Sequence, residues 1–213
     1  MRSKSIVSVV NVAIAITALF SITALAAPAA FAHHAMGGGL PATELEGFIS
    51  GLAHPIIGLD HFAFVVAIGL LAATKPQGPW LPIGFVLAAL AGTALHLLAF
   101  DLPVPEIFIS VSVLVIGVLL TLTNRPRLVL LVVLSAIAGL FHGYAYGESI
   151  IGAEPNPLVS YLLGFTTIQL GIAAFAFTLG KWVLANSSAA ILNRIGFVLC
   201  GAGAAFLSTA LLG

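Results

Sequence analysis

The segment HPIIGLDHFAFVVAIGLLAA, residues 54–73, places three ionisable side chains within eight positions of an apolar run: His54, Asp60 and His61. An ionisable residue inside a membrane span is costly and commonly functional. Neutral imidazole and carboxylate suit divalent Zn, Ni, Co or Fe, whereas Cu(I) prefers Cys and Met. Sulfur ligands are scarce, with one cysteine, Cys200, and two methionines in the chain. The segment therefore predicts a site for a divalent transition metal and disfavours a copper pathway.

Two further histidines and one acid extend the set of candidate metal-binding residues: His96, His142 and Glu148. Along straight helices that rise 1.5 Å per residue, His54, His96 and His142 lie roughly 7–12 Å below the outer ends of their spans. Asp60 and His61 lie about 21–22 Å deep by the same count. The spacing therefore predicts an outer layer of three imidazoles, with Asp60 and His61 as a deeper station for the ion.

Small residues predict which way these histidines face. In the first span, glycines and histidines follow 4-3-4-3 spacing along one stripe: Gly47, Gly51, His54, Gly58 and His61. Similar stripes of small residues include His96 and run beside His142. Membrane helices pack closely where small residues recur in this way. We therefore expect the histidines to face the interior of a helix bundle and not the lipid.

Pro55 predicts a kink near His54, because proline lacks the backbone donor and clashes with the preceding turn. On a straight helix, His54 and His61 would stand about 10 Å apart and would not share one ion. Either the helix unwinds between them, or the two residues hold the ion in succession. We favour the second arrangement.

Composition places the chain in a membrane. Of its 213 residues, 61% are hydrophobic and only 7% are charged, with a mean hydropathy of +1.19. Soluble domains carry about 25% charged residues, and several apolar runs here exceed the roughly 18 residues that indicate a span. Such spans are expected to be helical, because the bilayer offers no water to unpaired backbone groups. The formal net charge of zero gives no indication of nucleic-acid binding.

Residues 1–32 resemble a secretory signal peptide, with a basic start, an apolar run and a small-x-small sequence that ends at Ala32. Cleavage there would leave His33 and His34 at an exported N-terminus, within a polar tail over residues 33–45. Those two histidines and the α-amine would then be able to capture an ion. The alternatives are an uncleaved first span and a tail with no metal-binding role.

Six apolar segments follow, each predicted to be a helix: 46–73, 80–100, 104–123, 128–147, 157–180 and 191–212. If the N-terminus is exported, all five basic residues of the mature chain fall in cytoplasmic loops: Lys75, Arg125, Arg127, Lys181 and Arg194. This distribution obeys the positive-inside rule. We therefore predict an all-α integral membrane protein of the plasma (inner) membrane. Its domain over 46–213 is a six-helix transmembrane bundle with both mature termini outside.

Two motifs resemble those of a known family. The sequence HPIIGLDH, residues 54–61, is similar to the signature of the HupE/UreJ family of nickel/cobalt permeases, and FHGYAYGES, residues 141–149, resembles its second polar motif. The resemblance covers essentially the whole mature chain. It implies metal-uptake roles for five residues: His54, Asp60, His61, His142 and Glu148. One departure is Gln169, where the fifth span of this family often has a histidine.

The predicted function is that of a secondary permease that imports Ni²⁺ or Co²⁺ as its transported substrate and holds no permanent cofactor. No GxxxxGK[ST] loop or HExxH sequence is present, so neither ATP hydrolysis nor zinc hydrolase chemistry is expected. The expected partners are the metal ion and the lipid bilayer. The choice between the two metals, proton coupling and the oligomeric state stay open, since nickel and cobalt are neighbours in the affinity order.

Other functions remain open at the sequence level. A haem-binding membrane cytochrome would use paired axial histidines, and the chain would also suit an accessory subunit of a membrane complex. A single intramembrane histidine such as His96 is often a hydrogen-bonding strut between helices. The aromatic residues Trp80, Tyr144 and Tyr146 are interpreted as anchors at the membrane interface.

Overall fold

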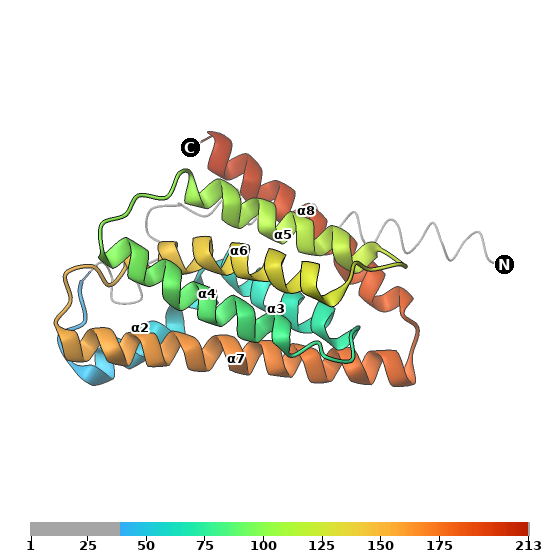
Figure 1. The fold of residues 1–213 in the computed structure, drawn as a ribbon, viewed down its shortest axis with the longest axis horizontal. Helices are drawn as coiled ribbons and strands as arrows, with labels where there is room; N and C mark the ends of the chain where they lie inside the picture. The colour runs from blue at the N-terminus through green and yellow to red at the C-terminus, as the bar shows by residue number, and fades with distance from the viewer. Residues whose placement is uncertain (1–38, 213) are drawn as a thin grey trace.

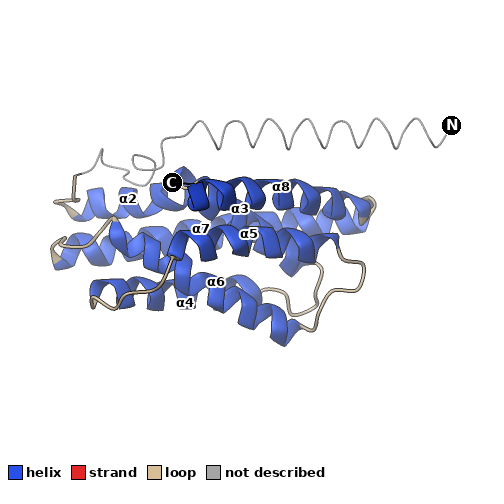
Figure 2. Ribbon diagram, turned by 90° about the horizontal axis from the view of Figure 1, so that it is seen from above, coloured by secondary structure: helices blue, strands red, loops and turns tan. Residues whose placement is uncertain are grey.

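The computed structural model describes residues 39–212, which form α-helices joined by short loops (Figures 1 and 2). The helices are α2 (Glu44–Ile57), α3 (Leu59–Ala73), α4 (Trp80–Leu97), α5 (Pro105–Thr121), α6 (Leu128–Glu148), α7 (Pro155–Asn186) and α8 (Ala190–Leu212). The predictions for the signal peptide and for His33 and His34 lie outside the described residues.

The first predicted span is not one continuous helix. Helices α2 and α3 meet at an angle of 80°, with Gly58 in an extended conformation between them (φ −71°, ψ 97°). Pro55 lies inside the last turn of α2, so the break comes three residues after it. The prediction of a single helix over 46–73 is therefore wrong, and the kink expected from Pro55 is a break at Gly58.

Four of the described helices, α4, α6, α7 and α8, are long and apolar enough to cross a membrane. The count rises to five if the bent pair α2–α3 forms one span, whereas α5, at 17 residues, is shorter. The described chain is thus an all-helical, multi-pass membrane protein. The predicted six-helix transmembrane bundle stays a prediction.

Glycines bring the helices together in three close pairs. A Cβ added to Gly51 of α2 would meet the carbonyl oxygen of Tyr161 in α7, and one added to Gly92 of α4 would meet that of Leu140 in α6. In the third pair, Gly117 of α5 lies against α8. The expectation that the glycine stripes face neighbouring helices is confirmed for α2, α4 and α6.

Helix α3 occupies the centre of the bundle. It contacts all three of these helix pairs through α4, α5, α7 and α8, and its residues from Ala63 to Ala73 are almost all buried. Its hydrophobic length forms much of the core, together with Leu81, Leu120 and Leu131 from neighbouring helices. The polar start of α3, just after the break, is therefore held in a fixed place among the other helices.

The loops that contain Lys75, Arg125 and Arg127 lie at one end of the bundle, where α7, with Lys181 near its end, leads into α8, with Arg194 near its start (Figure 1). The ammonium group of Lys75 donates to the backbone oxygen of Arg125 at 3.3 Å. The guanidinium of Arg125 donates in turn to the oxygen of Leu120 at the end of α5, at 2.8 Å, and contacts Asn193 of α8 at 3.4 Å. The predicted grouping of cations at one end is present, while its sidedness in the membrane stays a prediction.

Replacing Gly92 with Ala is expected to destabilise the protein, because the added Cβ meets the α6 backbone. Overpacking typically costs about 1–3 kcal/mol, which exceeds the gain of about 1 kcal/mol from alanine's helix propensity. Gly171→Ala is the matched control, since nothing lies within 4 Å of a Cβ added there. Thermal unfolding in detergent should give a lower Tm for Gly92→Ala alone. Equal Tm values for the two variants would contradict close packing between α4 and α6.

Candidate functional site

Three of the predicted histidines meet at the α2–α3 break. The ring centroids of His54 and His61 lie 5.8 Å apart, and those of His61 and His142 lie 4.8 Å apart. All three imidazoles are buried. Because the helix breaks between His54 and His61, the favoured arrangement of an outer layer and a separate deeper station is wrong. The alternative, an unwound helix that brings the two residues together, is what the structure contains.

Hydrogen bonds join these imidazoles to each other and to two serines. The Nδ1 atoms of His61 and His142 lie 2.7 Å apart. On its other side, His142 Nε2 lies 3.0 Å from the hydroxyl of Ser112 in α5. His54 Nδ1 lies 3.0 Å from the hydroxyl of Ser149, just beyond α6. Four elements thus contribute to one largely buried polar cluster: α2, α3, α5, and α6 with the residue that follows it.

Two tyrosines complete the cluster. The ring of Tyr146 lies between two histidines, with its centroid 5.0 Å from that of His54 and 4.6 Å from that of His61. The hydroxyl of Tyr161, from α7, donates to the Tyr146 backbone oxygen at 3.0 Å and lies 2.9 Å from the Ser149 hydroxyl. Tyr146 is fully buried, so its interpretation as an interfacial anchor is wrong.

Gln169 lies at the edge of this cluster. It is fully buried in α7, where its amide nitrogen donates to the Phe165 carbonyl at 3.1 Å and its amide oxygen accepts from Tyr146 at 3.4 Å. The residue that departs from the family pattern therefore contacts the same polar network as the histidines.

Of the other predicted residues, Asp60 lies beside the cluster, whereas His96 and Glu148 are not among the groups that bond or stack with the three imidazoles. Asp60 is half-buried and accepts the backbone N–H of His61 at 2.8 Å, at a helix start where negative charge is favourable. His96 is half-buried beside the Tyr144 ring, with centroids 4.4 Å apart, and its Nδ1 has no hydrogen-bond partner among the described residues. Glu148 is exposed at the end of α6. Within residues 39–212, no three His, Cys, Asp or Glu side chains are arranged to hold a metal.

Several members of the cluster were missed at the sequence level. Tyr146 and Ser149 stand four and seven positions after His142, so they share its helical stripe, and this spacing was a usable signal. Tyr161 and Gln169 stand eight positions apart on α7, a weaker signal of the same kind. Ser112 belongs to no motif, and its contact with His142 depends on how α5 packs.

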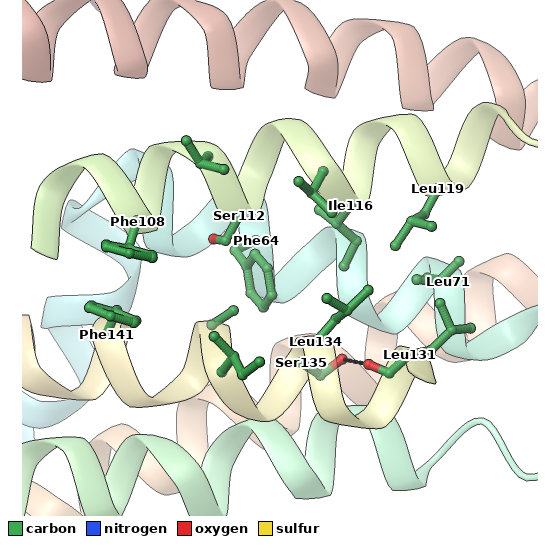
Figure 3. A pocket seen from close by; sticks show the side chains of 14 residues that line it. Phe64, Leu71, Phe108, Ser112, Ile116, Leu119, Leu131, Leu134, Ser135 and Phe141 are labelled. Atoms are coloured by element: carbon green, nitrogen blue, oxygen red, sulfur yellow. Dashed lines mark hydrogen bonds between the residues drawn. The ribbon is translucent and has the colours of Figure 1, made fainter. Parts of the chain in front are cut away.

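Two phenylalanine rings pack against His142. The rings of Phe64 and Phe85 lie 4.7 and 5.5 Å from the His142 ring, centroid to centroid. A cavity of about 130 Å³ lies between α5 and α6 and is lined by Phe64, Ser112 and Ser135 among mainly apolar side chains (Figure 3). Ser112 is therefore part of both the polar cluster and the cavity lining.

Comparisons with known proteins agree on one family. The family described as "HupE / UreJ protein" matches residues 20–206. Protein HupE of Rhizobium leguminosarum bv. viciae is 27% identical over 189 residues, which cover 88% of this chain and 95% of that relative. No solved structure matches the chain.

Replacing Tyr161 with Phe is expected to lower stability, because the lost hydroxyl contacts Ser149 and the Tyr146 backbone. A hydrogen bond of this kind contributes about 0.5–1.5 kcal/mol. Tyr144→Phe is the control, since the Tyr144 hydroxyl has no hydrogen-bond partner within the described residues. Thermal unfolding should separate the two variants. A Tm as high for Tyr161→Phe as for Tyr144→Phe would show that the buried network adds no stability.

Proposed function

Because the chain belongs to the HupE/UreJ family, we propose that it is a permease that imports a divalent transition metal ion, Ni²⁺ or Co²⁺, without hydrolysing ATP. One observation carries this proposal. Three buried imidazoles, from His54, His61 and His142, converge where a membrane helix is broken. Intramembrane ionisable groups commonly mark ion pathways, and broken helices at membrane depth are tolerated where they are enclosed by protein or line a cavity.

The chemistry of the cluster suits these metals. Neutral imidazole binds nickel and cobalt well, whereas a site made only of oxygen ligands suits harder ions such as magnesium or calcium. Without an ion, the imidazoles and hydroxyls hydrogen-bond to each other, so the cluster avoids the cost of buried unpaired polar groups. An entering ion would take the place of some of these hydrogen bonds. The pair formed by His61 and His142, whose Nδ1 atoms lie 2.7 Å apart, must separate or rotate if both rings are to contact one ion.

Acidic residues at one end of the bundle would mark the side from which the metal ion enters. The loops at the end of the bundle opposite the basic loops contain Asp101 and Glu154, and Glu148 is exposed at the same end (Figure 1). These carboxylates would raise the local concentration of cations. Asp60, beside the cluster, would stabilise the charge of an ion that has lost part of its water.

The membrane potential is a sufficient driving force for such a permease. Each charge that crosses 100 mV gains about 2.3 kcal/mol, so a divalent ion gains about 4.6 kcal/mol. At about 1.4 kcal/mol per tenfold ratio, this supports more than a thousandfold accumulation. Nickel stands only slightly above cobalt in the affinity order, so the preferred substrate has to come from a competition assay.

His61→Ala and Asp60→Asn are expected to reduce uptake of radioactive nickel or cobalt to background, in cells that lack their own importers of these metals. The first variant removes an imidazole of the cluster, and the second removes the neighbouring negative charge. His96→Ala is the control, because His96 lies outside the cluster, and it should retain most of the uptake. Immunoblots of membranes should show equal amounts of all variants. Normal accumulation by His61→Ala would contradict the proposed pathway.

A further inference from the structure

We propose that Ser112 is a positioning residue that sets the tautomers of His142 and His61, so that His61 presents the lone pair of Nε2 to an incoming metal ion. The role of the metal ion in this proposal rests on the function proposed above. The tautomers themselves are a property of the metal-free protein, and they are measurable without transport.

The Ser112 hydroxyl lies between a backbone carbonyl and the His142 ring. Its Oγ lies 2.6 Å from the carbonyl oxygen of Ile109 and 3.0 Å from His142 Nε2. A carbonyl oxygen only accepts, and a serine hydroxyl has one hydrogen to donate. Two oxygens 2.6 Å apart with no hydrogen between them would repel each other, so this hydrogen lies toward Ile109. The contact with His142 must therefore be a donation from the ring, Nε2–H to Oγ.

The remaining hydrogens follow from the valence of imidazole. A neutral ring carries one N–H, so a His142 ring that is protonated at Nε2 has a bare, accepting Nδ1. His61 Nδ1 lies 2.7 Å from that atom, and it must therefore be the donor. His61, protonated at Nδ1, then carries its lone pair on Nε2. One serine hydroxyl thereby determines the hydrogen positions on two successive rings.

The position of the His61 ring places this lone pair near the α2–α3 break. The ring atom Cδ2, which is bonded to Nε2, lies against Gly58, where an added Cβ would be only 2.6 Å away. The edge of the ring that carries the ligand nitrogen therefore lies at the α2–α3 break, and Nδ1 is engaged with His142. Metal-binding histidines commonly donate their second N–H to a fixed acceptor, which orients the ring and raises its basicity. His142 fills that role for His61, so its own part is to orient a ligand.

The cavity between α5 and α6 makes Ser112 suitable for a matched substitution. Ser112 lines this cavity (Figure 3), so a side chain with one more methyl group has space there. Threonine keeps a hydroxyl that bonds a carbonyl one turn back in a helix, whereas valine has the same shape without the hydroxyl. Ser135 lines the same cavity and bonds the Leu131 carbonyl at 2.7 Å. Ser135→Ala is therefore a control that removes a similar hydroxyl without touching a histidine.

The direct test is ¹⁵N NMR of the full-length protein in lipid bilayers, labelled at histidine and free of metal, with signals assigned from single replacements. The wild type and Ser112→Thr should show His142 protonated at Nε2 and His61 protonated at Nδ1. Ser112→Val should show a mixture of tautomers for both rings, and Ser135→Ala should match the wild type. A His142 ring protonated at Nδ1 in the wild type, or an unchanged spectrum in Ser112→Val, would overturn the assignment.

Metal uptake gives a second readout. Loss of a partner that orients a ligand typically weakens metal affinity about 10–100-fold. Ser112→Val should therefore raise the nickel concentration for half-maximal uptake by about this factor, with Ser112→Thr and Ser135→Ala close to wild type. Equal values for the threonine and valine variants would refute the positioning role. If the wild type transports neither metal, the proposed function fails, while the NMR result still decides the tautomers.

Discussion

A membrane helix that breaks inside the bilayer must pair its backbone groups within the protein, and the break at Gly58 is the constraint on which the polar cluster depends. The Gly58 N–H still bonds the His54 carbonyl at 3.0 Å, and the Gly58 carbonyl accepts from Phe62 at 2.9 Å. The Asp60 side chain takes the N–H of His61. The backbone therefore changes direction by 80° with its hydrogen bonds locally satisfied, and this turn carries His61 toward His54.

Close helix packing makes the break useful. Glycines bring α2 against α7 and α4 against α6, so α6 and α7 supply side chains to the same place. His142, Tyr146 and the neighbouring Ser149 then reach the histidines of the broken span. Most polar atoms of the cluster pair with each other, and aromatic rings surround them. Such a network is rigid when all its hydrogen bonds are formed. Only a small set of side chains would have to rearrange when an ion binds.

Much of the fold was predictable, because membrane helices follow from composition and their packing faces follow from small residues. The segments predicted at 128–147 and 191–212 agree closely with α6 and α8. The convergence of His54 and His61 was not predictable, because depth was counted along a straight helix and the direction of the turn depends on packing against α7. His96 was placed in the same layer for the same reason, although its ring contacts only Tyr144 among the described aromatic rings.

The central claim is that the imidazoles at the break bind the transported ion. X-ray absorption of the purified protein in bilayers, loaded with nickel, tests it most directly, because imidazole rings give a characteristic scattering pattern around the metal. The predicted result is imidazole coordination in the wild type that is reduced in His61→Ala and unchanged in His96→Ala. A nickel shell made only of oxygen atoms, or a spectrum unaltered by His61→Ala, would contradict the claim.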